Sequence, residues 1–295
     1  MSHFSIRRSI LLGAAAYPLL SACTALGDQA HASASARQQL SAIENSLDGR
    51  LGLFACDTAD GRRLAYRAEE RFPMCSTFKL LLVSAILKMS APQAGLMQHV
   101  LSYRQSDLVD YSPITEKHVG AGMSITALCA AALQYSDNTA ANLLIAQLGG
   151  LAAVTAFARS IGDQQFRLDR WETDLNTAIP GDPRDTSTPE AMSSSLQRLA
   201  LGDVLAPAQR EQLCLWLRGN TTGAARIKAG IPASWTIGDK TGGGQYGTAN
   251  DIAVLWPPQR SPVILAIYTT RHQQAATARN ELIAAAARVV AGWLG

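Results

Sequence analysis

The stretch Arg71–Lys79, with the sequence RFPMCSTFK, determines how the rest of the chain is interpreted. Pro73 suits the first turn of a helix, because its ring fixes φ near the helical value. The run from Leu80 to Leu87 is almost wholly apolar, which predicts a helix buried on most sides. Ser76 and Lys79 are three positions apart, so both should project from one face near the start of that helix.

Ser76 and Lys79 suit nucleophilic catalysis. A hydroxyl near a helix start lies close to backbone N–H groups that have no helical partner, and close to the positive end of the helix dipole. Both features favour an oxyanion. A lysine in an apolar setting loses its charge easily and could accept the serine proton. A Ser-x-x-Lys pattern is expected about once by chance in a chain of this length, so the pair needs support from elsewhere.

Three further stretches supply that support. Ser136–Asn138 (SDN) stands between two helical runs and alone indicates a helix N-cap. Lys240–Gly244 (KTGGG) follows a predicted strand, Trp235–Asp239, and alone indicates a turn. Arg170–Asn176 (RWETDLN) opens a segment rich in turn residues and alone indicates a surface loop. Taken alone, each stretch is better explained by its ordinary structural role than by catalysis. The occurrence of all the motifs in this order nevertheless favours a catalytic site.

Composition and charge exclude several classes of protein. The chain has 295 residues, of which 47% are hydrophobic and 17% are charged, as in ordinary globular proteins with one large or two small domains. Two of the three net positive charges come from Arg7 and Arg8. We therefore expect no nucleic-acid partner. The five cysteines match no metal-binding spacing, so we expect no metal and no other cofactor, and treat the later cysteines as small buried hydrophobes.

The N-terminus resembles an export signal. Arg7 and Arg8 precede a short, mostly apolar run from Ser9 to Ala22, which is too short to span a bilayer comfortably. Residues 1–22 are therefore predicted to be a signal peptide that directs the chain to the periplasm. Ile6–Leu11 also resembles, loosely, a twin-arginine signal.

Cys23 is a candidate for lipidation. Leu20–Cys23 (LSAC) resembles a bacterial lipobox, in which the cysteine becomes the lipidated mature N-terminus and anchors the protein to the membrane. The alternative is a plain secretory peptide cut beside Cys23. Residues 23–36, rich in Ala and Ser, are predicted to form a spacer.

Strand patterns occur in two separate parts of the chain, with helical patterns between them. Because a lone hairpin is marginal, the two strand regions are expected to form one sheet. We predict a two-part α/β (α+β) fold, with an antiparallel sheet flanked by helices from residues 37–71 and 218–295, and an all-helical part from residues 72–217. The expected strands are 50–56, 63–66, 235–239, 252–256 and 263–269, with a helix over 37–47 and a closing helix over 275–294. An active site is expected between the two parts.

The motifs in this order closely resemble those of the class A serine β-lactamases, which combine Ser-x-x-Lys, Ser-Asp-Asn and Lys-Thr-Gly. The resemblance extends from about Arg37 to the C-terminus and is strongest to penicillinases with a cysteine before the nucleophile, here Cys75. It implies the serine β-lactamase/DD-peptidase-like fold. It also implies hydrolysis of the β-lactam amide of penicillins and cephalosporins through a serine acyl-enzyme, and thus antibiotic resistance.

The resemblance also implies a role for each catalytic residue. Ser76 would attack the lactam carbonyl and form the acyl-enzyme. Lys79 would be the base for acylation, or would share that role with Glu172 acting through a water. Ser136 would pass a proton to the departing lactam nitrogen. Glu172, with Asn176, would activate the water that releases the product.

Several residues are expected to contact the substrate. Arg226 is assigned from its position, because Ala249 stands where many family members have an arginine. With Lys240 and Thr241 it would bind the substrate carboxylate. The backbone N–H groups of Ser76 and Gly243 would form the oxyanion hole. The complete set of expected substrate-binding residues is Tyr111, Asn138, Asn176, Arg226, Lys240, Thr241, Gly242 and Gly243. Arg170 and Asp185 would pair across the neck of the loop that carries Glu172.

Two alternatives share these motifs. A penicillin-binding DD-peptidase would be acylated by penicillin but would release it slowly; Glu172 and Asn176 argue against it, because they provide the water for a second step. A β-lactam sensor domain would need a membrane span, which is not visible beyond the short signal. We therefore favour a β-lactamase, which we expect to be a monomer.

Overall fold

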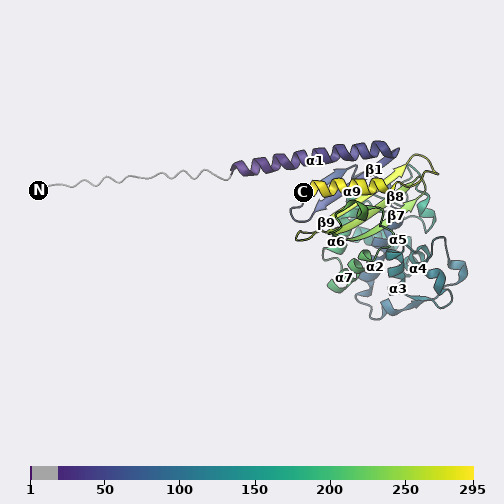
Figure 1. Ribbon diagram of the computed structural model, residues 1–295. Coiled ribbons are helices and arrows are strands. Elements are labelled where there is room, and N and C mark those ends of the chain that lie inside the picture. Colours follow the sequence, from purple (N-terminus) through teal and green to yellow (C-terminus); the bar gives the residue numbers. More distant parts are fainter. Residues whose placement is uncertain (2–18) are drawn as a thin grey trace.

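The computed structural model describes Met1 and residues 19–295, with side chains from residue 31 onward (Figure 1). The signal peptide predicted over residues 1–22 therefore lies almost wholly outside the described residues. The side chain of Cys23, the candidate lipidation site, lies outside them as well.

A five-stranded antiparallel sheet combines strands from both ends of the chain. Its strand order is β2-β1-β9-β8-β7, which places β7 at an edge. The prediction that the two strand regions form one sheet is confirmed. The strands are β1 (Gly49–Asp57), β2 (Arg63–Tyr66), β7 (Thr236–Gly244), β8 (Thr248–Trp256) and β9 (Val263–Arg271).

The two faces of the sheet bury separate sets of side chains, because successive residues of a strand point to opposite faces. On β9, Leu265 and Ile267 belong to the core beneath α1 (Leu19–Leu47) and α9 (Asn280–Leu294). Their neighbours Ile264 and Ala266 belong to the core shared with the helical part. In Figure 1, α1 and α9 accordingly lie along one side of the sheet, and the helical part lies on the other.

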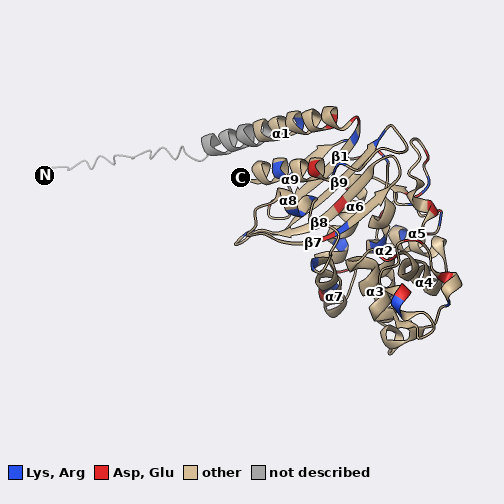
Figure 2. Cartoon of the chain, turned by 45° about the vertical axis from the view of Figure 1, so that its right-hand side comes forward, with Lys and Arg blue, Asp and Glu red and all other residues tan. Residues whose placement is uncertain are grey.

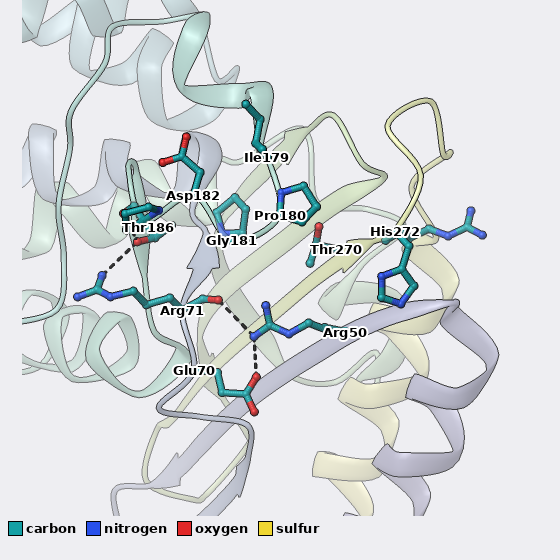
Figure 3. Close-up of a pocket in the computed structure, with 13 residues that line it drawn as sticks. Arg50, Glu70, Arg71, Ile179, Pro180, Gly181, Asp182, Thr186, Thr270 and His272 are labelled. Atoms are coloured by element: carbon teal, nitrogen blue, oxygen red, sulfur yellow. Dashed lines mark hydrogen bonds and ion pairs between the residues drawn. The ribbon is translucent and has the colours of Figure 1, made fainter.

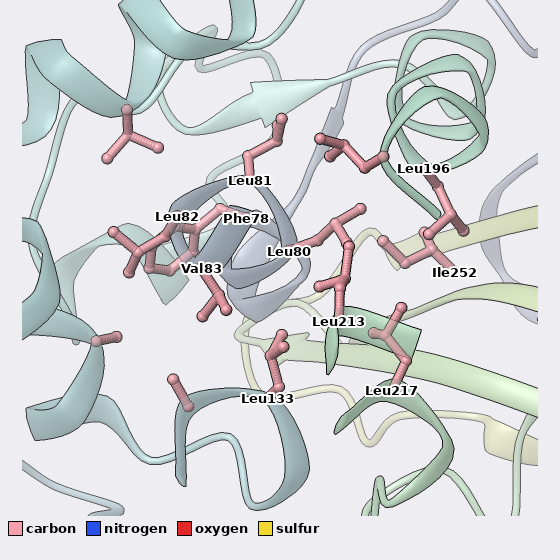
Figure 4. Packing of buried hydrophobic residues seen from close by; sticks show 14 of the residues in the cluster. Phe78, Leu80, Leu81, Leu82, Val83, Leu133, Leu196, Leu213, Leu217 and Ile252 are labelled. Carbon is pink, nitrogen blue, oxygen red and sulfur yellow. The ribbon is translucent and has the colours of Figure 1, made fainter. Parts of the chain in front are cut away.

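Helix α2 (Lys79–Ser90) is the centre of the helical part, since every residue from Lys79 to Leu87 is buried. Figure 4 shows Leu80–Val83 surrounded by side chains of other helices, such as Leu133, Leu196 and Leu213. The predicted burial of this helix on most sides is thus confirmed. The surrounding helices are α3 (Ile125–Gln134), α4 (Asn138–Leu148), α5 (Leu151–Ser160), α6 (Pro189–Ala200) and α7 (Pro207–Arg218).

Short elements complete the described fold. They are the strands β3 (Phe72–Pro73), β4 (Val100–Leu101), β5 (Met123–Ser124) and β6 (Thr186–Ser187), the helix α8 (Ile227–Gly230), and the 3-10 turns Cys75–Phe78, Leu96–Gln98, Gln105–Asp107, Thr115–His118 and Asp174–Thr177. Across residues 19–295, no single helix is both long and apolar enough to cross a bilayer, although the bent pair α4 and α5 together reach that length and composition.

Several boundaries differ from expectation. Pro73 lies in β3, paired with Thr186 of β6, rather than in the first turn of a helix. Its carbonyl accepts a hydrogen bond from Asn250 Nδ2 at 2.8 Å, and the helical backbone begins only at Met74, just before the 3-10 turn at Cys75. The closing helix begins at Asn280 rather than Ala275. Helix α1 also continues through the predicted spacer, whose C-terminal end at Ala36 is buried in the core beneath α1 and α9.

Lys240–Gly244 does not form the turn that its glycines indicate, because it belongs to β7. Gly242 pairs with Asn250 and Gly244 with Thr248 of β8. The four cysteines outside the N-terminal segment, Cys56, Cys75, Cys129 and Cys214, are free and buried, as expected for small hydrophobes.

Candidate active site

A cavity of about 560 Å³ brings the separate sequence motifs together. It is lined by Ser76, Tyr111, Ser136, Asn138, Asn176, Thr221, Thr222, Arg226, Thr241, Gly242 and Gly243. The other expected site residues, Lys79, Glu172 and Lys240, are buried and hydrogen-bonded to residues of this lining. In Figure 2, basic and acidic residues accordingly lie close together where β7 approaches α2.

Ser76 lies in the 3-10 turn that leads directly into α2. The preceding residue, Cys75, has a left-handed backbone with φ of 44°, which is strained for a residue with a side chain. Strand β7 passes close to this turn. A Cβ at Gly242 would lie 2.8 Å from the Met74 carbonyl oxygen and 3.3 Å from Ser76 N. Glycine at position 242 is therefore needed for the edge strand to approach the serine.

Glu172 and Lys79 meet beside Ser76. Glu172 Oε1 accepts a hydrogen bond from Ser76 Oγ at 3.2 Å and forms an ion pair with Lys79 Nζ at 3.0 Å. Lys79 Nζ also donates to Asn138 Oδ1 at 2.6 Å and to the Ser136 carbonyl oxygen at 2.8 Å. Burial lowers the pKa of Lys79, while the Glu172 carboxylate opposes that shift. The site therefore holds a carboxylate that can accept the serine proton directly, and a lysine that contacts the same carboxylate.

Hydrogen bonds to the loop and to α4 fix the position of Glu172. Asn176 Nδ2 donates to Glu172 Oε2 at 2.6 Å. The Asn142 side chain makes two hydrogen bonds to the Glu172 backbone. Its Nδ2 donates to the Glu172 carbonyl at 2.9 Å, and its Oδ1 accepts from Glu172 N at 3.1 Å. The predicted pair between Arg170 and Asp185 at the neck of the loop is confirmed, with 2.6 Å between Arg170 Nε and Asp185 Oδ2. Sequence reasoning missed Asn142, although its place four residues after Asn138 on α4 puts both on one helix face.

Two lysines converge on Ser136. Ser136 Oγ accepts hydrogen bonds from Lys240 Nζ at 3.0 Å and from Lys79 Nζ at 3.5 Å. Burial lowers the pKa of Lys240 well below its usual value, and the nearby charge of Lys79 lowers it further. Ser136 has a left-handed backbone, with φ of 60°. The N-cap role of this motif is also confirmed, because the Asp137 side chain accepts from Ala140 N at the start of α4.

Arg226 reaches the cavity from the residue before α8. Its Nη1 donates to the carbonyls of Gly242 at 2.7 Å and Asn250 at 2.6 Å, and its Nε donates to Asn280 Oδ1 at 2.9 Å. Burial lowers the pKa of this guanidinium. A Cβ at Gly243 would lie 3.8 Å from Arg226 Nη2. The anchored guanidinium therefore stands beside Gly243, one of the expected substrate-binding residues.

Thr222 joins the same part of the cavity, with 2.5 Å between its Oγ1 and Thr241 Oγ1. Sequence reasoning missed it, because its contact with β7 is a matter of tertiary register. Tyr111, another residue of the lining, is 61% exposed and has φ of 62°. The Asn138 amide donates to the Asp110 carbonyl at 2.8 Å, which ties the Tyr111 segment to α4.

A second cavity, of about 340 Å³, is lined in part by a later segment of the loop that carries Glu172 (Figure 3). We call it the rear cavity. Its lining combines the segment Ile179–Pro183 with Arg50, Glu70, Arg71, Pro73, Thr186, Thr270, Arg271 and His272. It shares no lining residue with the catalytic cavity.

The geometry of the catalytic cavity defines a hydrolase with a serine nucleophile, because a serine at a helix start contacts a carboxylate that also holds a buried lysine. Comparison with known proteins identifies the family. The model of the β-lactamase enzyme family matches residues 35–294. The chain is 55% identical to β-lactamase Toho-1 of Escherichia coli over 97% of both chains. It is 64% identical to the crystal structure of a β-lactamase from Desulfarculus baarsii, with a TM-score of 0.88 and coverage of 89% of this chain and 98% of the other.

A crystal structure of a β-lactamase from Burkholderia phymatum is 48% identical and also has a TM-score of 0.88, over 90% of this chain and all of the other. The chain therefore belongs to the β-lactamase enzyme family as a class A serine β-lactamase, a hydrolase of the β-lactam amide. The predictions of family and fold are thereby confirmed.

Proposed function

We propose that the protein hydrolyses the β-lactam ring of penicillins and cephalosporins through an acyl-enzyme on Ser76, and so confers antibiotic resistance. The observation that carries the proposal is the position of Glu172, whose Oε1 contacts both Ser76 Oγ and Lys79 Nζ while its Oε2 is held by Asn176. One carboxylate can then serve both the formation and the hydrolysis of the acyl-enzyme.

In acylation, Ser76 Oγ attacks the lactam carbonyl and loses its proton. Lys79 and Glu172 were both candidate bases for this step. Among the hydrogen bonds of the described residues, Ser76 Oγ contacts Glu172 directly, which favours Glu172 as the first acceptor of the proton. Lys79 Nζ, 3.0 Å from the same oxygen, would stabilise the carboxylate and pass a proton onward to Ser136.

The departing lactam nitrogen needs a proton, which Ser136 supplies in this proposal. Its hydroxyl can give a proton to the nitrogen and regain one from Lys79 or Lys240, since both ammonium groups are hydrogen-bonded to Ser136 Oγ. The lowered pKa of Lys240 makes that second transfer easier. Water then hydrolyses the ester, with Glu172 as the base and Asn176 holding the carboxylate in place.

The remaining lining residues bind the substrate in this proposal. The cationic side chains Arg226 and Lys240, with Thr241, attract the carboxylate of the β-lactam. The backbone N–H groups of Ser76 and Gly243 stabilise the oxyanion, which the close approach at Gly242 supports. Asn138 binds the side-chain amide of the substrate, and Tyr111 flanks the entrance.

The test is a stopped assay of the purified mature chain with a penicillin, followed by intact-mass measurement. We expect rapid product formation with little adduct. A stable adduct on Ser76 with negligible turnover would instead indicate a DD-peptidase or a sensor and would refute the role given to Glu172 in hydrolysis.

We also propose that the chain is exported to the periplasm, anchored through a lipid on Cys23, and works as a monomer. The charged and apolar pattern before Cys23 supports export. Fractionation of cells producing the full chain should place the mature protein with the membrane, and Cys23→Ser should release it as a soluble species. Light scattering of that soluble variant should give the mass of one mature chain. An uncleaved chain in the cytoplasm would refute export.

A further inference from the structure

Asp239 and Asp251 form a buried carboxyl pair behind the catalytic cavity. Asp251 on β8 lies opposite Thr241 of β7, and Asp239 precedes Thr241 by two residues, so all three point to the same face of the sheet. The two aspartates are 4% and 0% exposed. Their carboxyl groups lie within reach of one another, and Asp251 Oδ1 is buried without a hydrogen-bond partner among the described residues.

Two buried carboxyl groups in contact cannot both be charged, so they hold one proton between them. Burial raises the pKa of both groups, and the proximity of Asp239 raises the pKa of Asp251 further. The surrounding cations are Arg226, beside Asp251, and Lys228 and Lys240, beside Asp239. They favour one negative charge in the pair. We assign that charge to Asp239, because it accepts a hydrogen bond from Asn220 Nδ2.

From Asp239, a chain of hydrogen bonds leads into the catalytic cavity. Asn220 Nδ2 donates to Asp239 Oδ2 at 2.5 Å. Asn220 Oδ1 accepts from Thr222 N at 3.0 Å and from Thr222 Oγ1 at 2.8 Å. Because Thr222 Oγ1 donates its only proton to Asn220 Oδ1, Thr241 Oγ1 must be the donor in its contact with Thr222 Oγ1. The charge on Asp239 therefore sets the direction of every hydrogen bond as far as Thr241.

From Asp251, a second connection leads to Arg226. Asp251 Oδ2 accepts from Ile227 N at 3.1 Å, the backbone N–H of the residue after Arg226. The guanidinium of Arg226 is in turn hydrogen-bonded to the carbonyl of Asn250, the residue before Asp251. The carboxyl pair thus contacts both sides of the region that is proposed to bind the substrate carboxylate.

We propose that Asp239 and Asp251 are positioning residues for substrate-carboxylate binding, and that the proton they share keeps Thr222, Thr241 and Arg226 in place. This inference rests on the proposed function. When the shared proton is lost at high pH, both carboxyl groups are negatively charged and repel one another, so one of them must move. This movement weakens the hydrogen bonds that lead from Asp239 to Thr241 and from Asp251 to the Arg226 segment. KM for substrates with a carboxylate then rises, whereas kcat changes little, because neither aspartate touches Ser76 or Glu172 in the described contacts.

The test compares the wild type with Asp251→Asn. An asparagine amide donates permanently to Asp239, so it replaces the shared proton with a hydrogen that cannot titrate. The alkaline rise in KM for a penicillin, about tenfold for the loss of one buried hydrogen bond to a charged group, should disappear in the variant. A penicillin ester, which lacks the free carboxylate, should show no such difference. Asp48→Asn, at an exposed position, is the matched control and should reproduce the wild-type profile.

Thermal unfolding gives a second readout that does not depend on activity. A carboxyl group whose pKa is raised by folding binds its proton more tightly in the folded state, so stability falls as pH rises from about 4 through the pKa of the pair. The Tm of Asp251→Asn should fall less than that of the wild type over this range, and Asp239→Asn should behave similarly. Identical pH profiles of both KM and Tm in wild type and Asp251→Asn would overturn the proposal. If no variant hydrolyses penicillin, the proposed function fails, and the Tm profiles still decide whether the pair shares a proton.

Discussion

The catalytic cavity and the rear cavity are each lined in part by the loop that carries Glu172, and basic side chains occur at both. Lys79 and Lys240 beside the catalytic cavity are fully buried, and both are hydrogen-bonded to Ser136. In the rear cavity, Arg50 is 36% exposed and pairs with Glu70 at 2.6 Å (Figure 3). Arg71 donates to Thr186 and to Gln165, both neutral. Charge of the same sign is thus fully buried at one cavity and only partly buried at the other.

The difference shows that burial, rather than the number of basic residues, gives the catalytic cavity its chemistry. A lysine without water holds its proton less tightly, and burial accordingly lowers the pKa of both Lys79 and Lys240. A partly exposed ion pair such as Arg50–Glu70 contributes about 0–1 kcal/mol to stability. We therefore expect substitutions at the two cavities to differ sharply in effect.

The largest difference is expected for matched glutamate substitutions. Glu172→Gln removes the base but keeps the hydrogen bond with Asn176, so steady-state turnover of penicillin should fall by about 10³. Acylation should be slower but still observable, because Lys79 remains as the other candidate base, and hydrolysis should be slower still, so that an adduct on Ser76 appears in the intact mass. Glu70→Gln at the rear cavity is the control and should keep wild-type turnover. Wild-type turnover by Glu172→Gln would remove Glu172 from the mechanism.

The next effect concerns stability. Asp185 is 1% exposed and accepts hydrogen bonds from Asp169 N, Arg170 N and Arg170 Nε. Asp185→Ala leaves the Arg170 guanidinium without its partner, and should lower the free energy of unfolding by about 3–5 kcal/mol. Urea denaturation measures this loss. A decrease below 1 kcal/mol would mean that the neck of the loop is no better organised than the surface pairs of the rear cavity.

A smaller effect is expected at Arg226. Arg226→Ala should lower kcat/KM for a penicillin by about 10- to 100-fold, as expected for lost hydrogen bonds to a charged group. The penicillin ester should lose much less, because it carries no free carboxylate. Arg71→Ala at the rear cavity is the matched control and should leave both values unchanged. Equal losses for the acid and the ester would show that Arg226 supports the fold of β7 rather than binding the carboxylate.

The sequence predicted the residues that carry the chemistry of the site better than the residues that hold them in position. Ser76, Lys79 and Glu172 could be recognised because their chemistry is tied to short motifs. Asn142, Thr222 and the pair of Asp239 with Asp251 had no such signal, since their roles come from contacts between elements distant in the chain. The glycines after Lys240 indicated a turn because glycine is depleted in strands. Two of them are nevertheless required in β7, because a Cβ at Gly242 would lie 2.8 Å from Met74 O and one at Gly244 would lie 2.9 Å from Cys75 Sγ.

The smallest effect is expected for Arg50→Ala. Arg50 donates to Glu70 and to the Arg71 carbonyl, and its guanidinium lies 4.4 Å from the centre of the Phe72 ring. Loss of the exposed ion pair should cost less than about 1 kcal/mol of unfolding free energy. Because Arg50 shares no contact with Glu172 or Asn176 in the described chain, kcat/KM should stay within about twofold of the wild type, a difference of about 0.4 kcal/mol. A severalfold change would show that the segment Ile179–Pro183 transmits the state of the rear cavity to Glu172, and the two cavities would then have to be treated as one coupled site.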